Sequence, residues 1–287
     1  MSLTTSASGD AILLLGAGRM GSALLRGWLA QGIPATAITV LDPNPDEDLR
    51  RLAGRTGLRL NPAEAGPAGI LVVAVKPQMV EAVARDVQAR LSGGSLVVSI
   101  MAGRTLADLR RLFPAAGAFV RAMPNLAAAV GQGATVAVAD PLCPPERVEQ
   151  AGRLLAAVGG LEWLADEELV DAATALSGSG PAYVFYLVEC LTRAGIGVGL
   201  PAEVAERLAR ATVEGAGALL CETGLPAAEL RGNVTSPGGT TQAGLAVLMG
   251  GGQLQALVSA TVTAAAERAR DLGGAPTTPH RTRQVEP

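Results

Sequence analysis

The segment that most constrains the fold lies at residues 12–21, which read Ile-Leu-Leu-Leu-Gly-Ala-Gly-Arg-Met-Gly. The apolar run predicts a buried strand, the glycines at 16, 18 and 21 have G-x-G-x-x-G spacing, and a helix-like stretch follows. In a dinucleotide site these glycines allow a tight turn, close approach of a diphosphate and tight helix packing, while the helix start favours phosphate. The segment predicts a nucleotide site; the alternative is a glycine-rich turn that binds nothing.

Strand-like and helix-like segments alternate from residue 11 to about residue 162, which predicts a parallel sheet covered on both faces. Strands are expected at 11–15, 37–41, 70–75, 95–100, 118–121 and 134–139. Helices are expected at 166–176, 181–194, 201–222, 226–232, 239–249 and 253–271. The predicted fold is α/β: a doubly wound sheet domain at 1–165, an all-helical domain at 166–272 and a disordered tail at 273–287.

Composition narrows the possible partners. The net charge of −3 and the lack of a basic cluster argue against nucleic acid. No apolar run reaches the roughly 18 residues of a membrane span, and the first residues lack the apolar part of a signal peptide. Three scattered cysteines fit a reducing cytoplasm and have no metal-site spacing. The Ala-rich helices carry more apolar surface than a small bundle can bury, which predicts a homo-oligomer.

Residues at the ends of the predicted strands are candidates for the cofactor site. Asp42 ends the second strand, 21 residues beyond the last glycine, about where an acidic residue meets an adenosine ribose. Alternatively, Asp42 only opens the Asp-Pro-Asn-Pro turn. Lys76, the only lysine, follows the third strand within Ala74-Val75-Lys76-Pro77, and Ala102 and Gly103 follow the fourth. Lys76 can contact a phosphate or ribose there, or be a solvated strand-end lysine.

A second candidate site lies in the helical half, at Val234-Thr-Ser-Pro-Gly-Gly-Thr-Thr241. Its glycines lead into a helix expected to begin near Thr240, so N–H groups can converge on an anion and hydroxyls add donors. The single histidine, His280, lies in the tail, so this loop is the strongest candidate in the sequence for binding a carboxylate. The alternative is a helix–helix turn with Ser/Thr caps. Glu167 and Asp171, which open the first helix of this half, are expected to be solvated.

Six segments together resemble the pyrroline-5-carboxylate reductase family over about residues 11–272. They are Gly-Ala-Gly-Arg-Met-Gly, Ala-Val-Lys-Pro-Gln, Ser-Ile-Met-Ala-Gly, Arg-Ala-Met-Pro-Asn, Leu-Ser-Gly-Ser-Gly-Pro-Ala-Tyr-Val-Phe and Val-Thr-Ser-Pro-Gly-Gly-Thr-Thr. The resemblance implies a Rossmann-type domain, a helical dimerisation domain and often a ring of dimers, with the active site between the domains. It also implies reduction of 1-pyrroline-5-carboxylate to L-proline by NADPH or NADH, the last step of proline biosynthesis.

The resemblance also implies roles for individual residues. The diphosphate would be held by Gly16, Gly18, Arg19, Met20 and Gly21. The ribose and nicotinamide side would be held by Asn61, Lys76 and the strand end Ala74, Val75 and Pro77. The substrate carboxylate and ring nitrogen would be bound by Ser236, Gly239, Thr240 and Thr241, with Asn233 and Glu167 nearby. Because water can protonate a cyclic imine near neutral pH, positioning would supply most of the rate, and the Thr241 hydroxyl would orient the ring nitrogen.

Some residues depart from the family pattern. Leu126-Ala127 replaces the usual Thr-Pro, Met249 stands where a glutamate is common, and Gly232 where a charged residue is common. The Asp42 carboxylate would repel a 2′-phosphate and so favours NADH, unless Arg50 or Arg51 compensates.

Two other functions remain possible from the sequence. A related imine or hydroxyacid reductase could share the two-domain plan, although hydroxyacid enzymes generally use a lysine on the helical domain and this chain has none there. A non-catalytic NAD(P)-binding regulator would have no need of Ser236 and Thr241.

Overall fold

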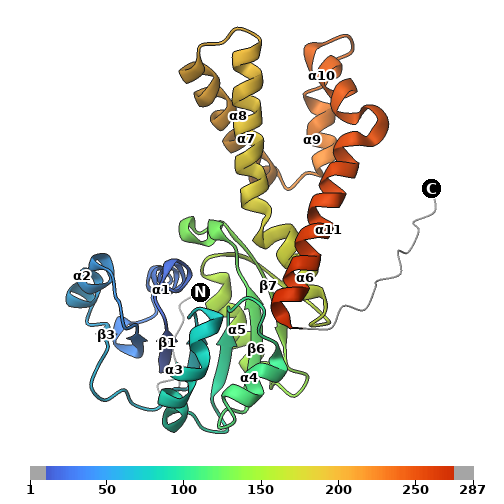
Figure 1. Cartoon of the computed structure of the whole chain (residues 1–287). Helices are drawn as coiled ribbons and strands as arrows, with labels where there is room; N and C mark the ends of the chain where they lie inside the picture. The colour runs from blue at the N-terminus through green and yellow to red at the C-terminus, as the bar shows by residue number, and fades with distance from the viewer. Residues whose placement is uncertain (1–10, 275–287) are drawn as a thin grey trace. The chain divides into compact units, whose positions relative to one another are not determined.

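The computed structural model describes residues 11–274, which form two compact units (Figure 1). Within the described residues, the first unit comprises residues 11–178 together with 265–274, and the second comprises Ser179–Ala264. By packing, residues 166–178 and the end of the last helix belong with the first unit. The predicted tail at 273–287 lies, apart from its first two residues, outside the described range.

An eight-stranded sheet in the order β3-β2-β1-β4-β5-β6-β7-β8 organises the first unit. Its strands are β1 (Ile12–Leu15), β2 (Ile38–Leu41), β3 (Arg59–Leu60), β4 (Ile70–Val73), β5 (Leu96–Ser99), β6 (Ala118–Met123), β7 (Gly133–Ala139) and β8 (Gly159–Trp163). The first six strands are parallel, as predicted, but β7 pairs antiparallel with β6, and β8 runs parallel to β7. The β6–β7 connection, built around the short turn η4 (Leu126–Val130), lacks the dozen or so residues that a parallel crossover needs. The sequence pattern had not indicated β3 or β8.

Helices cover both faces of this sheet (Figure 1). They are α1 (Arg19–Ala30), α2 (Glu47–Thr56), α3 (Val80–Val87), α4 (Leu106–Leu112), α5 (Pro145–Ala156) and α6 (Leu169–Ala173). Because successive strand residues point to opposite faces, Leu14 packs in one core with Trp28 of α1, whereas Leu13 packs in the other with Leu109 of α4. Both faces are therefore buried, as the apolar strand runs predicted.

A buried arginine ties three elements of the first unit together. Arg121 of β6 has a side chain that is 6% exposed and pairs with Glu167 at 3.0 Å and Asp171 at 3.2 Å. Glu167 also accepts a hydrogen bond from the Leu106 N–H at the start of α4, at 2.8 Å. The two carboxylates expected to be solvated are instead held in an ion-pair network that links β6, α4 and α6.

The second unit is helical and buries little apolar surface of its own. It contains α7 (Gly180–Gly197), α8 (Ala202–Thr223), α9 (Ala227–Asn233), α10 (Thr240–Met249) and the first part of α11 (Gln253–Gly273). In α8 only Ala205 and Ala209 are buried, and α7, α9 and α10 have no buried residue. Phe185 and Tyr186 are more than half exposed, which supports the expectation that these helices meet another chain.

One stretch, Thr240–Gly273, is long and apolar enough to cross a membrane by length and composition, which the sequence pattern had not indicated. It is not one continuous helix, because α10 ends at Met249 and α11 begins at Gln253. Between them Gly251 and Gly252 have φ of 63° and 67°. Such a break would leave backbone polar groups unsatisfied in lipid, and the end of α11 packs with the first unit, so the stretch is two separate helices.

The ion-pair network predicts a stability defect. Arg121→Met keeps most of the side-chain volume but leaves two carboxylates without their partner, so we expect unfolding free energy to fall by about 3 kcal/mol. Arg153→Met, which removes an exposed arginine 4.0 Å from Glu149, is the control and should cost less than about 1 kcal/mol. Urea unfolding at one fixed protein concentration measures both; equal losses would contradict a buried role for Arg121.

Candidate active site

Two glycines bring α1 against the ends of β1 and β4. Gly16 has φ of 89°, and its N–H donates to the Leu41 carbonyl at 2.8 Å. A Cβ on Gly21 would lie 2.2 Å from the Gly16 carbonyl oxygen, and one on Gly16 would lie 2.9 Å from the Ala74 oxygen. Neither position has room for a side chain, so both glycines are needed for this close approach.

Gly18 differs from these two glycines, because the structure leaves room for a side chain at this position. It is the N-cap of α1 with φ of −63°, and a Cβ there would meet nothing within 4 Å. No side chain caps this helix, so the N–H groups of its first turn, at Arg19 and Met20, have no helical partner. Open space in front of uncapped donors fits the diphosphate of a dinucleotide.

Asp42 is held in place beside this loop. Its Oδ2 accepts from the Ala17 N–H at 2.7 Å and its Oδ1 from the Asn44 N–H at 2.8 Å. The Asn61 amide brackets the Asp42 backbone, accepting from its N–H at 2.9 Å and donating to its carbonyl at 2.7 Å. Asn61 has φ of 46°, a left-handed conformation that asparagine tolerates better than most residues. Asp42 therefore both opens its turn and fixes the glycine loop.

The segment predicted to bind the nicotinamide side of the cofactor, Ala74–Pro77, follows β4. This strand lies on the opposite side of β1 from β2, which Asp42 follows. Ala74 donates its N–H to the Leu15 carbonyl at 2.8 Å, and the exposed Lys76 precedes the turn η2 (Pro77–Met79). Because β1 lies between β2 and β4, the structure places Asn61 with Asp42 rather than with Lys76, with which the resemblance had grouped it.

Packing against α11 explains why residue 103 is glycine. It has φ of 70°, and a Cβ there would lie 2.8 Å from the Leu272 carbonyl oxygen near the end of α11. Its neighbour Ala102 is exposed. The packing of α11 therefore accounts for glycine at 103 without a cofactor.

The predicted substrate loop forms a tight turn at the start of α10. Gly239 is the N-cap, and its N–H donates to the Ser236 carbonyl at 3.0 Å. A Cβ on Gly239 would lie 2.4 Å from the Ser236 Oγ, so glycine lets this hydroxyl lie over the turn. Thr240 and Thr241 are exposed, and within residues 11–274 their hydroxyls have no hydrogen-bond partner. Uncapped N–H groups and free hydroxyls thus lie together at one helix start.

The other two residues predicted to lie near the substrate, Asn233 and Glu167, belong to different units. Asn233 ends α9 in the second unit and is exposed. Glu167 belongs to the first unit, where Arg121 and the Leu106 N–H already engage its carboxylate. Among residues 11–274, no three His, Cys, Asp or Glu side chains gather as a metal site requires.

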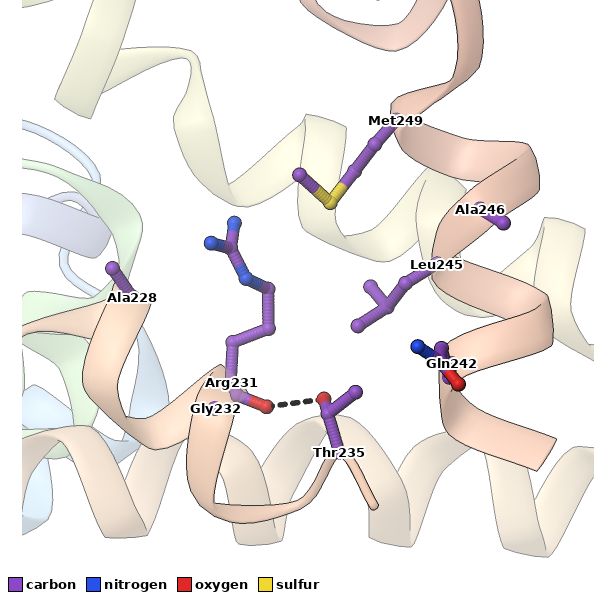
Figure 2. Close-up of a pocket in the computed structure, with 8 residues that line it drawn as sticks. All are labelled: Ala228, Arg231, Gly232, Thr235, Gln242, Leu245, Ala246 and Met249. Carbon is purple, nitrogen blue, oxygen red and sulfur yellow. Dashed lines mark hydrogen bonds between the residues drawn. The ribbon is translucent and has the colours of Figure 1, made fainter. Parts of the chain in front are cut away.

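A cavity of about 410 Å³ lies between α9 and α10, with the side chains of Arg231 and Met249 directed into it (Figure 2). The Thr235 hydroxyl at its rim donates to the Arg231 carbonyl at 2.6 Å. Gly232 and Met249, two departures from the family pattern, both line it, whereas Ser236 and Thr241 are not among its lining residues. The cavity thus contacts the substrate loop at Thr235, but Ser236, Thr240 and Thr241 do not line it.

Sequence reasoning missed the roles of Arg121 and Asn125. Asn125 is buried, donates to the Ser177 carbonyl at 3.0 Å and accepts from the Ala134 N–H at 3.1 Å. It thereby joins the β6 end to β7 and to the π-helical turn η5 (Thr174–Gly178). A charged residue inside the apolar strand Phe-Val-Arg-Ala-Met was the available signal, because a buried arginine needs partners.

Comparisons with known proteins give one consistent result. A family model described as pyrroline-5-carboxylate reductase dimerisation matches residues 167–272, and one described as NADP oxidoreductase, coenzyme F420-dependent, matches residues 11–103. The pyrroline-5-carboxylate reductases of Pseudomonas aeruginosa and Mycobacterium tuberculosis are each 39% identical, covering 91% of this chain and 96% of theirs.

Solved structures agree with these relatives. A pyrroline-5-carboxylate reductase from Coxiella burnetii superposes with a TM-score of 0.85 at 33% identity, covering 92% of this chain and 99% of that one. The pyrroline carboxylate reductase of Plasmodium falciparum with NADP bound gives 0.74 at 26% identity, covering 92% and 98%.

Two glycine variants separate a packing role from a binding role. In Gly18→Ala the methyl enters open space, so we expect an unchanged melting temperature but dinucleotide binding weakened at least about tenfold, or 1.4 kcal/mol. In Gly21→Ala the methyl collides with backbone, so we expect stability to fall by about 3 kcal/mol or more. Thermal unfolding and calorimetric titration with NADH and NADPH measure both effects. Unchanged binding in Gly18→Ala would remove the α1 start from the cofactor site.

Proposed function

The chain belongs to the pyrroline-5-carboxylate reductase family, and on that premise we propose that it reduces 1-pyrroline-5-carboxylate to L-proline with NADH or NADPH. The observation that carries this proposal is the pairing of an open, uncapped α1 start at Gly18 with 39% identity to such enzymes over 91% of the chain. A glycine-rich turn without a ligand would not need the space in front of Gly18 to stay empty.

For the cofactor, which supplies the hydride when bound, we propose three groups of contacts. The first-turn N–H groups of α1 receive the diphosphate, aided by the exposed Arg19. Asp42, supported by Asn61, accepts from the adenosine ribose hydroxyls. Lys76 and the strand end Ala74–Pro77 bind on the nicotinamide side.

For the imino acid, we propose that the start of α10 is the binding site. Its uncapped N–H groups, with the Ser236 and Thr240 hydroxyls, offset the substrate carboxylate charge. The Thr241 hydroxyl orients the ring nitrogen, and Asn233 lies close by in sequence. Since water can protonate the imine, these residues need only hold the ring in a reactive orientation. The contacts of Glu167 favour a positioning part for this residue, through Arg121 and α4.

The second unit supports an assembly of several copies. The dimerisation model covers 167–272, and the helices of this stretch leave large apolar side chains exposed in the single chain. We propose a homodimer or a ring of dimers that works in the cytoplasm without nucleic acid or membrane partners.

The direct test is steady-state oxidation of NADH and of NADPH in the presence of 1-pyrroline-5-carboxylate, with proline identified as the product. Turnover with this substrate above that with a six-membered cyclic imino acid or a hydroxyacid supports the proposal. Cofactor binding without turnover on any of them would favour a regulator instead.

Thr241→Ala provides the residue-level test. Loss of one orienting hydrogen bond should raise the barrier by roughly 1–3 kcal/mol, seen as a lower kcat/KM. Thr212→Ala is the control, because that hydroxyl donates to the Leu208 carbonyl within α8 and should not affect the rate. An unchanged kcat/KM in Thr241→Ala would exclude this hydroxyl from the mechanism.

A further inference from the structure

We propose that the cavity between α9 and α10 binds a small organic anion, a monocarboxylate with an apolar body, and that Arg231 receives its carboxylate. The residues that line the cavity lie between Ala228 and Met249 and so belong to the second unit alone. Binding there does not depend on the proposed reaction, because the hydroxyls of Ser236 and Thr241 do not line the cavity.

Arg231 carries a charge that nothing in the described chain offsets. Its side chain is directed into the cavity (Figure 2), and among residues 11–274 its guanidinium has no ion pair and no hydrogen bond. By contrast, Arg193 of α7 lies 3.6 Å from Glu189, one helical turn away. The residues three and four positions from Arg231 are all uncharged, so no such neighbour can reach it. Its planar fork is left to receive an external carboxylate.

The polar groups beside Arg231 offer donors and no counter-charge for a cation. Gln242 accepts from the Gly238 N–H through Oε1 at 2.6 Å, which leaves its NH2 group as a donor, and Figure 2 shows that nitrogen on the cavity side. The Arg231 carbonyl already accepts from the Thr235 hydroxyl at 2.6 Å. No carboxylate lies among the described residues that line the cavity. A simple carboxylate therefore fits, whereas the ammonium of an amino acid would find no partner.

The remaining wall is mostly apolar. Leu245 and Met249 line the cavity from α10, and Ala228 lines it from α9. Met249 is 57% exposed, so the hydrocarbon part of a ligand would cover apolar surface that the single chain leaves in water. The volume of about 410 Å³ lies in the range of about 300–1,000 Å³ usual for small-molecule sites. One cation on an apolar wall indicates a carboxylate with a short hydrocarbon chain.

A second copy of the chain is the alternative occupant, since the helices of this unit leave apolar side chains exposed. An apolar helix face laid over the cavity would bury the Arg231 charge without a partner, which is strongly unfavourable. A small anion neutralises that charge and covers Met249 at the same time. Charge complementarity therefore favours the small anion.

Equilibrium dialysis of labelled hexanoate against the full-length protein, without cofactor or substrate, tests the proposal. We expect a dissociation constant of about 1 mM or below. Three competitors each change one property: hexanamide lacks the charge, acetate lacks the chain, and norleucine adds an ammonium. Each should bind at least about tenfold more weakly than hexanoate. Equal affinity for hexanamide or norleucine would contradict recognition by a lone cation.

Three variants locate the binding site. Arg231→Gln removes the charge and should weaken hexanoate binding at least about tenfold. Met249→Glu keeps the arginine but places a carboxylate in the cavity wall, so it should weaken binding to a similar extent by pairing with the guanidinium. Arg207→Gln removes an exposed arginine of α8 that lies 3.9 Å from Glu203, and this matched control should leave the affinity unchanged. Melting temperatures identify any variant that fails to fold, and the other cavity variant then decides.

No hexanoate binding by the folded protein would overturn the proposal. Unchanged affinity in folded Arg231→Gln or Met249→Glu would also overturn it, by placing hexanoate elsewhere, such as at the start of α10. Light scattering at the same protein concentrations reports association of copies. Hexanoate affinity that falls as copies associate would assign the cavity to a second copy instead. Failure of the chain to reduce 1-pyrroline-5-carboxylate would contradict the proposed function but leave these binding results standing.

Discussion

The backbone contact between Gly16 and Gly21 is the constraint on which the proposed cofactor site depends. With 2.2 Å between a Cβ on Gly21 and the Gly16 oxygen, α1 can begin this close to the strand ends only because no side chain intervenes. The far end of the same helix is fixed in the opposite way, by the buried Trp28, whose indole donates to the Leu154 carbonyl at 2.9 Å. A missing side chain at one end and a large one at the other thus aim the N–H groups of the first turn.

Much of the first unit could be predicted because its signals are local. Short apolar runs indicate buried strands, and the glycine spacing with Asp42 indicated the loop that the structure shows. Strand direction is not local, since it depends on how many residues connect β6 to β7. The partners of Arg121 are not local either: Glu167 is 46 residues away, and nothing in an apolar strand pattern identifies which acid will meet a buried arginine. A pattern of residue types can require a partner without identifying it.

The two units hold their folds by different means. The first has two apolar cores, one on each face of a sheet. In the second, α7 and α8 pack through small residues, with a Cβ on Gly195 only 3.1 Å from that of Ala205, and leave large side chains outside. Small residues allow close helix packing but bury little surface, so the helices of the second unit gain little of the apolar burial that stabilises a lone domain.

This difference affects how stable a single chain is before it associates with another copy. A unit that completes its core only with another copy has no stability independent of protein concentration, because mass action links folding to association. A newly made chain is thus most exposed to proteolysis and aggregation before it meets a second one. Dilution alone, without heat or denaturant, should then be enough to inactivate the molecule over time, even though the cofactor-binding half carries a complete core of its own.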